Sequence, residues 1–213
     1  MKPLAALTVL GLLVLLGLGA SGLFPRPELP LPEHVAAAWG ARNLVATIVL
    51  GARLWDTLFE ILIYAMAIVG VKLGLRPVRW EGAGPPVAET PLLRRAADLL
   101  LGPVIVFALY VATSGHLGPG GGFPAGALLG TGLLLLLALA KGVERLSAEV
   151  HEPTLEWVKY GAIVAILALT GVVLVLGRKG SPYLIAANLL ITVEVAIGAW
   201  VILHRFAKSR GEL

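Results

Sequence analysis

The sequence contains no cysteine, which excludes disulfide bonds, zinc–thiolate sites and iron–sulfur clusters held by this chain. Only 14% of its residues are charged, against about 25% in an average soluble domain. It also lacks the Walker loop, HExxH and GxSxG motifs, which mark nucleotide hydrolysis, metalloproteolysis and serine hydrolysis. We therefore predict no cofactor, no bound metal and no bond-making chemistry for this chain.

Apolar side chains, in contrast, are abundant, since 58% of the 213 residues are hydrophobic and the mean hydropathy is +0.89. These values indicate an all-α integral membrane protein, because a helix satisfies its own backbone hydrogen bonds inside lipid. The net charge of +4 is too small to indicate nucleic-acid binding. The basic residues instead report which side of the membrane each loop occupies.

Six apolar runs are about as long as the ~20 residues that a helix needs to cross a bilayer. We predict transmembrane helices at Leu4–Phe24, Trp55–Leu75, Ala96–Thr113, Pro124–Ala140, Tyr160–Leu176 and Tyr183–Leu203. The first run also resembles a secretory signal, and we favour an uncleaved span. The residues Glu149–Glu156 are predicted to form a polar connection between two spans.

The run Glu33–Arg53 is too polar for a clear span, although its apolar residues recur at roughly helical spacing. We predict one in-plane amphipathic helix near residues 34–52, lying at the membrane surface. A second crossing is the alternative, and it would reverse the sidedness of everything that follows. With six spans, both termini share one side, which then holds 12 of the 17 Lys and Arg residues. This asymmetry predicts cytoplasmic N- and C-termini.

The stretch between the second and third spans is rich in proline and glycine, which favours a boundary there. We predict a two-span module over residues 1–81, a linker over 82–91 and a four-span domain over 92–213.

Glu194 lies near the middle of the last span, with no basic residue beside it in the sequence. An ionised carboxylate at the bilayer centre costs at least ~2.5 kcal/mol. Glu194 must therefore face a partner group, water or a neighbouring subunit, or else be protonated. Such a residue can take up and release a proton or bind a cation. The alternative is a neutral acid that is hydrogen-bonded to another helix.

Asp56 and Glu60 are four residues apart and therefore share one face of the second span. Two carboxylates on one face can relay a proton or hold a hard cation, and the Thr57 hydroxyl lies nearby. Alternatively, Asp56 sits at the helix N-terminus and pairs with Arg53. His116 could titrate near neutral pH, although a lone histidine is more often a hydrogen-bonding loop residue.

A glycine loop, GHLGPGGGFPAG from Gly115 to Gly126, separates the third and fourth spans. Its three consecutive glycines, flanked by prolines, cannot continue a helix and permit close approach of other backbones. With the apolar run before it, this block resembles the MnhB domain over roughly Leu92–Phe206. MnhB is one of the membrane subunits of Mrp-type multisubunit sodium/proton antiporters, and its domain also occurs in membrane-bound hydrogenase complexes. The residues that carry the resemblance are His116, Pro119, Gly120, Gly121, Gly122 and Phe123.

The segment Asn43–Val71 is similar to the C-terminal part of the large membrane subunit of the same antiporters. Asn43, Asp56, Thr57 and Glu60 match that family, whereas Trp55 and Phe59 replace its usual phenylalanine and glycine. Together the two resemblances imply a fusion of two neighbouring subunits in one chain.

The resemblance implies a multi-pass subunit of the cell inner membrane, in a cation/proton antiporter that moves Na⁺ and/or H⁺. Its expected partners are the lipid bilayer and other membrane subunits, and no nucleic acid. Glu60 and Glu194 would line the ion pathway, assisted by Asp56, Thr57 and His116, and the glycine loop would pack or seal the outer face. A non-transporting assembly subunit of a hydrogenase or another redox-driven pump is the main alternative. A self-contained channel is less favoured, because no two-halves repeat is visible.

Overall fold

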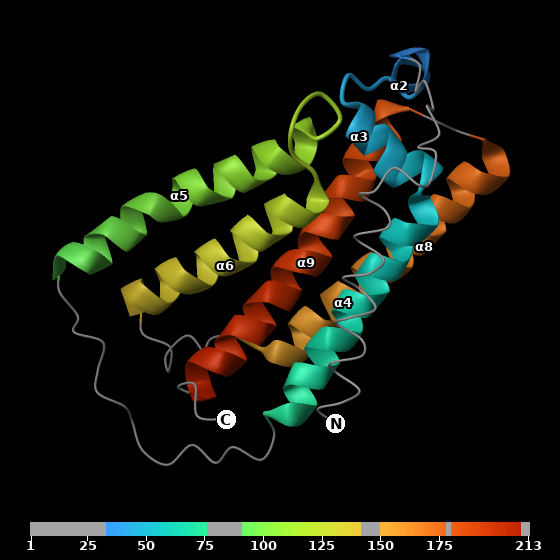
Figure 1. Ribbon diagram of the computed structural model, residues 1–213. Helices are drawn as coiled ribbons and strands as arrows, with labels where there is room; N and C mark the ends of the chain where they lie inside the picture. Colours follow the sequence, from blue (N-terminus) through green and yellow to red (C-terminus); the bar gives the residue numbers. More distant parts are fainter. Residues whose placement is uncertain (1–32, 76–90, 142–149, 178–179, 210–213) are drawn as a thin grey trace, which may run out of the picture. The chain divides into compact units, whose positions relative to one another are not determined.

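The computed structural model describes residues 33–75, 91–141, 150–177 and 180–209 (Figure 1). The chain divides into two compact units, residues 1–32 and 33–213, and every described residue belongs to the second. Within the described ranges all regular elements are helices, which confirms the predicted all-α class.

The described residues of this unit include five long helices: α4 (Leu54–Gly74), α5 (Pro91–Ser114), α6 (Gly122–Lys141), α8 (Glu152–Leu176) and α9 (Ser181–Ser209). Four of them, α4, α5, α8 and α9, are long and apolar enough to cross a membrane, and the apolar part of α6 is shorter. The predicted span Leu4–Phe24 and most of the predicted linker lie outside the described residues. The total of six spans, the sidedness of the termini and the domain boundary at residues 82–91 therefore stay predictions.

The prediction of one continuous helix near residues 34–52 is wrong. The structure has α2 (Glu33–Ala38), then a turn, then α3 (Leu44–Thr47), which runs into the π-helical turn η1 (Ile48–Ala52). The break arises because Gly40 adopts a left-handed φ of 62° and the side chain of Asn43 caps α3 by accepting a bond from Val45 N. Neither piece approaches the ~20 residues that a crossing needs, so this segment is not a second span either.

The apolar side chains of this segment meet protein. Trp39 and Leu50 are buried in a cluster with the first turn of α9, where the Trp39 ring centroid lies 5.8 Å from that of Tyr183. The Tyr183 hydroxyl donates a hydrogen bond of 2.9 Å to the carbonyl oxygen of Leu50. The apolar periodicity of residues 34–52 therefore reports packing against α9.

Helix α9 is the centre of the arrangement, because it packs against α4, α5, α6 and α8 and is the most buried of the candidate spans. Figure 1 shows α6 on one side of α9 and both α4 and α8 on the other, with α5 packed on α6. Two faces of α9 are thus engaged by different neighbours.

Helix α6 meets α9 through three glycines, which we call the glycine seam: Gly122, Gly126 and Gly130. A Cβ atom on Gly126 would lie 2.6 Å from the Cβ of Val195, and one on Gly122 would lie 2.5 Å from the Cβ of Ile191. The spacing of four residues puts all three glycines on one face, so the two backbones approach closely.

Helix α8 begins earlier than the sequence predicted. It starts at Glu152, not near Tyr160, because Pro153 occupies the first turn, where a missing backbone N–H costs nothing. Residues 152–156 of the predicted polar connection Glu149–Glu156 are therefore helical, and Lys159 lies two turns inside the helix.

Candidate functional site

Glu194 is fully buried on α9, with 0% of its surface exposed. Neither of its carboxylate oxygens has a hydrogen-bond partner among the described residues. It lies on the side of α9 that faces α4 and α8, since the Tyr64 hydroxyl of α4 bonds the adjacent Val195 carbonyl at 3.3 Å. Gly198, one turn further along α9, abuts Tyr64 and Ile68. Glu194 is therefore a polar group in a buried position that the described residues leave without a hydrogen bond.

Lys159 of α8 is the counterpart of Glu194, and the sequence pattern did not identify it. Its exposed fraction is 1%, and its Nζ has no hydrogen-bond partner in the described part of the chain. Nζ lies 4.5 Å from the ring centroid of Tyr160, and the charges of Lys159 and Glu194 act on each other. Two groups of opposite charge are thus buried within electrostatic reach of each other, without a hydrogen bond between them.

A network of ion pairs closes the end of the unit where α4 and α9 end and α8 begins. The Lys72 Nζ lies 3.2 Å from Oε1 of Glu152 and also bonds Oε1 of Glu156. The Arg205 Nη2 lies 2.8 Å from both oxygens of Glu152. These four side chains are 19% to 29% exposed, so this end of the bundle is more open than the interior around Glu194.

The buried pair and the end network follow one another along two helices. On α8, Glu152, Glu156 and Lys159 occupy positions i, i+4 and i+7 and share one face. At 1.5 Å per residue, Glu156 lies ~6 Å and Lys159 ~10 Å beyond Glu152. On α9, Glu194 precedes Arg205 by eleven residues and lies ~16 Å deeper by the same rise. We call this set the charged seam: Lys72, Glu152, Glu156, Lys159, Glu194 and Arg205.

Asp56 and Glu60 are both exposed on α4. The Asp56 carboxylate pairs with Arg53, its Oδ2 lying 2.5 Å from Nη2, as the alternative interpretation of Asp56 anticipated. Thr57 is buried and donates a hydrogen bond of 2.7 Å to the Val49 carbonyl, so its hydroxyl is occupied. The structure does not bring Asp56 or Glu60 together with Glu194, and their roles in ion transport stay predictions.

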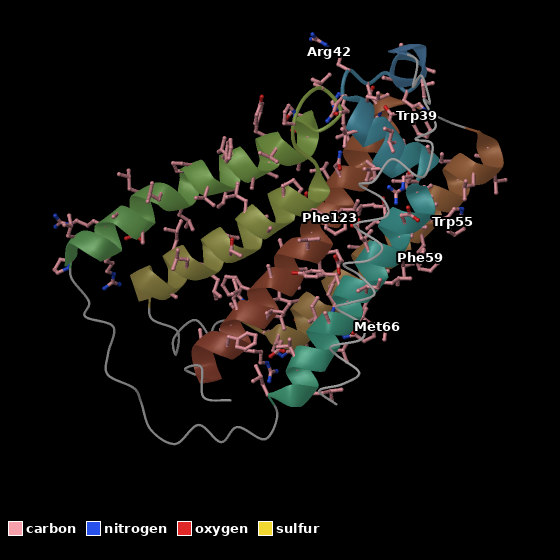
Figure 2. The ribbon with its side chains drawn as sticks, viewed as in Figure 1. Trp39, Arg42, Trp55, Phe59, Met66 and Phe123 are labelled. Atoms are coloured by element: carbon pink, nitrogen blue, oxygen red, sulfur yellow. The ribbon has the colours of Figure 1, made fainter. Side chains whose placement is uncertain are left out.

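The outward face of α4 is strongly apolar around Glu60. Trp55, Phe59 and Met66 are among its exposed large side chains, and Figure 2 shows these three on the outer side of the helix. A carboxylate placed inside such a face would be expensive against lipid. Glu60 is therefore a carboxylate within an otherwise apolar exposed face of α4.

The glycine loop is bonded to the segment before α3. The Asn43 Nδ2 donates to the carbonyl oxygens of Gly115 and Gly118 at 2.8 and 2.7 Å. The carbonyl of His116 accepts bonds from the backbone N–H groups of Arg42 and Asn43. The buried His116 ring contacts the Thr113 carbonyl through Nδ1 at 2.9 Å. His116 thus joins loop to segment, and its predicted part in an ion pathway is untested.

The loop's glycines serve its close fit to α9. Gly121 has a φ of 132°, which favours glycine, and Gly122 N donates a 2.9 Å hydrogen bond to the Asn188 Oδ1. Phe123 packs against the apolar cluster of α4, α8 and α9, whereas Pro119 is exposed. The loop therefore continues the glycine seam at the N-terminal end of α6.

A cavity of about 130 Å³ lies beside this loop, lined by residues that include Asn43, Thr57, Phe123 and Asn188. The side-chain nitrogen Nδ2 of this Asn188 is buried and has no hydrogen-bond partner in the described ranges. Glu194 does not line this cavity, and no cluster of three metal-ligating side chains occurs among the described residues. The lining is mainly apolar, and its polar side chains are those of Asn43, Thr57 and Asn188.

Comparison with known proteins supplies two matches. Residues 92–207 match the family model described as "Domain related to MnhB subunit of Na+/H+ antiporter". The fold also matches a chain in the structure of the membrane-bound sulfane sulfur reductase, an archaeal respiratory membrane complex, at 25% identity and a TM-score of 0.72. That match covers 96% of this chain and 97% of the other. None of the curated proteins matches.

Proposed function

This chain belongs to the family of domains related to the MnhB subunit of Na⁺/H⁺ antiporters, and we propose that Glu194 is its ion-carrying group. The chain is a multi-pass membrane subunit of an antiporter-like complex. In this proposal the Glu194 carboxylate takes up and releases a proton, or binds Na⁺, as the complex works.

The observation that carries the proposal is the state of Glu194 in the interior. A carboxylate held only for structure would be hydrogen-bonded, because an unsatisfied buried polar group is destabilising. Both Glu194 oxygens lack a partner among the described residues, while the opposite charge of Lys159 lies within electrostatic reach. An acid that must exchange a proton or cation needs free oxygens of this kind.

Further parts of the proposal concern assembly. Another membrane subunit of the complex covers the outward face of α4 and so gives Glu60 a protein environment. The match to the respiratory complex covers 96% of this chain with one chain of that complex. This supports a single polypeptide in which the segment before α5 is joined to the MnhB domain. The charged end of the bundle faces the cytoplasm, and the complex lies in the inner membrane.

A purely architectural subunit is the second candidate, and specific observations favour it. The glycine seam and the bonds of Asn43 to the glycine loop fix α6, α9 and the segment before α4 without any mobile charge. The two candidates differ in what neutralisation of Glu194 does to transport.

The test is Glu194→Gln in the complete complex, assayed in everted vesicles with recovery of the complex measured in parallel. We expect at least a tenfold loss of cation-driven proton flux with normal recovery. Thr192→Val is the matched control, because Thr192 is buried on the face of α9 that meets α6. Normal flux in Glu194→Gln would overturn the transport role, and loss of the assembled complex would favour the architectural one.

A further inference from the structure

We propose that Glu156 and Lys159 form a one-sided proton inlet that connects water at the charged end of the bundle to Glu194. This inference rests on the proposed function, because it supplies the route by which protons reach a fully buried carboxylate. It assigns a transport role to Glu156 and Lys159, whose positions within a helix the sequence did not reveal.

Exposure falls step by step along the charged seam. Glu156 has 29% of its side chain exposed, Lys159 has 1% of its surface exposed, and Glu194 has none. The axial step from Glu156 to Lys159 is ~5 Å, and the difference in helix depth between Lys159 and Glu194 is ~6 Å. Long flexible side chains bridge steps of this size, and Lys159 lies in the electric field of both acids.

The two glutamates of α8 are held differently, and this identifies the one that changes charge. Glu152 accepts from Arg205 through both of its oxygens and also contacts Lys72. Glu156 has Lys72 as its hydrogen-bonded cation. When Glu156 takes up a proton, Lys72 keeps Glu152 as a counter-charge, so no half-buried cation is left unpaired. Glu152 is thus the fixed anchor, and Glu156 the group free to be neutralised.

The transfer sequence conserves protons and moves no electrons. A hydronium ion from the aqueous end gives a proton to the Glu156 carboxylate and leaves water. The resulting carboxylic acid passes that proton to Lys159 and becomes a carboxylate again; Lys159 is a neutral amine at this point because it gave its own proton to Glu194 in the preceding cycle, and Glu194 has since released that proton. The Lys159 ammonium then gives a proton to the Glu194 carboxylate, which leaves a neutral amine and a neutral acid in the interior. Both products suit a low-dielectric site.

Beyond Glu194, towards the glycine loop, the described interior holds no buried carboxylate and no buried lysine or arginine. Large apolar side chains from α4, α8 and α9 occupy most of that region, beside the buried but uncharged Thr170 and Asn188: Ile61, Ile163, Ile166, Leu184 and Ile191. Protons therefore have a charged route to Glu194 from one end and a mainly apolar region without acid or base side chains of this kind at the other. Such one-sidedness is what a carrier site needs, because a route open at both ends would leak.

Lys159 provides the independent observation for this route. A structural lysine in a dry interior would bond its counter-charge directly, since an unpaired buried cation is destabilising. Its Nζ instead has no hydrogen-bond partner within the described residues while lying between acids at two depths. This position suits a proton carrier.

The first test uses Glu156→Gln, Glu194→Gln and their double variant in the complete complex. We expect each single variant to lower proton flux at least tenfold, and the double to be no lower than Glu194→Gln, because the groups act in series. Asp98→Asn, at an exposed acid of α5, is the control and should retain flux. Normal flux in Glu156→Gln with an inactive Glu194→Gln overturns the inlet alone. Normal flux in both overturns the proposed function as well.

The second test measures access and not activity. Because the chain has no cysteine, a cysteine placed at Lys159 or at Val173, on the same buried face of α8, is the single thiol of the chain. The complete complex with the native chain gives the background from other subunits. We expect a small cationic methanethiosulfonate reagent, added from the charged end, to modify Lys159→Cys at least tenfold faster than Val173→Cys. Equal rates, or protection of both positions, would overturn the inlet.

Discussion

The two faces of α9 differ in chemistry although they belong to one helix. Towards α6, Ile191, Val195 and Ala199 meet glycines at close range, and no charge is present on the described side chains of this contact. Towards α4 and α8, Glu194 and Arg205 belong to the charged seam, whose deepest atoms lack hydrogen bonds to other described residues. Close packing without polar groups fixes the position of two helices, whereas charged groups without hydrogen bonds can still change their protonation. The face of α9 towards α6 therefore stabilises the fold, and the face towards α4 and α8 carries the groups that could exchange protons or cations.

A large side chain in the glycine seam should give the largest loss of assembled complex. Gly126→Leu drives a side chain into Val195 and the Thr192 carbonyl, and both helices would have to separate. We expect at least a tenfold loss of recovered complex, measured by detergent extraction and size-exclusion chromatography. Gly102→Leu on α5 is the control, because no described atom lies within 4 Å of a Cβ built there. Equal recovery of both variants would contradict the importance of close packing at this seam.

Breaking the buried charge pair should come next. Lys159→Met leaves an unpaired Glu194 carboxylate in the interior and should lower stability by about 3 kcal/mol. Adding Glu194→Leu removes the second charge and should restore the thermal midpoint of the complex while transport stays absent. If the double variant were less stable than Lys159→Met, removing the unpaired Glu194 carboxylate would not relieve the destabilisation. The two charges would then not compensate each other in the interior.

Removing the hydrogen bonds between Asn43 and the glycine loop tests how much this loop stabilises the segment before α3. Asn43→Ala loses two hydrogen bonds to Gly115 and Gly118 and the cap on α3, which together contribute about 2 kcal/mol. Limited proteolysis should then cut near residues 39–43 faster than in the native complex. Ser114→Ala removes only a hydroxyl bonded within its own helix and should leave the cleavage rate unchanged.

Weakening the ion pairs at the charged end of the bundle should give the smallest loss of stability. Arg205→Gln weakens one partly exposed ion pair of Glu152 and should cost about 1 kcal/mol, less at high salt. Arg53→Gln is the control, because the Arg53–Asp56 pair is 69% and 58% exposed and should contribute almost nothing. Thermal midpoints at low and high salt measure both, and a salt-independent loss in Arg205→Gln would contradict the electrostatic origin.

The sequence predicted the five long helices, because apolar runs of this length have few other folds. It also singled out Glu194 from its depth in a span. Lys159 was missed because the apolar run begins after it, although Pro153 and the spacing of Glu152, Glu156 and Lys159 signal an earlier helix start. The break near Gly40 was missed because the helical periodicity of the apolar residues outweighed two local signals, Gly40 and the capping residue Asn43. The bonds from Asn43 to a loop more than seventy residues away are tertiary, and the local sequence does not reveal them. Periodicity alone also cannot tell whether an apolar face meets lipid or protein, as Trp39 shows.

The wide turn η1 has a consequence for the whole segment before α4. Its i to i+5 bond, from Arg53 N to the Ile48 carbonyl at 2.7 Å, accommodates one residue more than an α-helical turn would. Because the wide turn absorbs this residue, the parts of the chain on either side of it keep nearly the rotational positions that a regular α-helix would give them. Deleting a single residue between 48 and 52 should therefore give an ordinary turn and leave Asn43 within reach of its carbonyl acceptors, whereas the same deletion inside α4 would rotate everything ahead of it by about 100°.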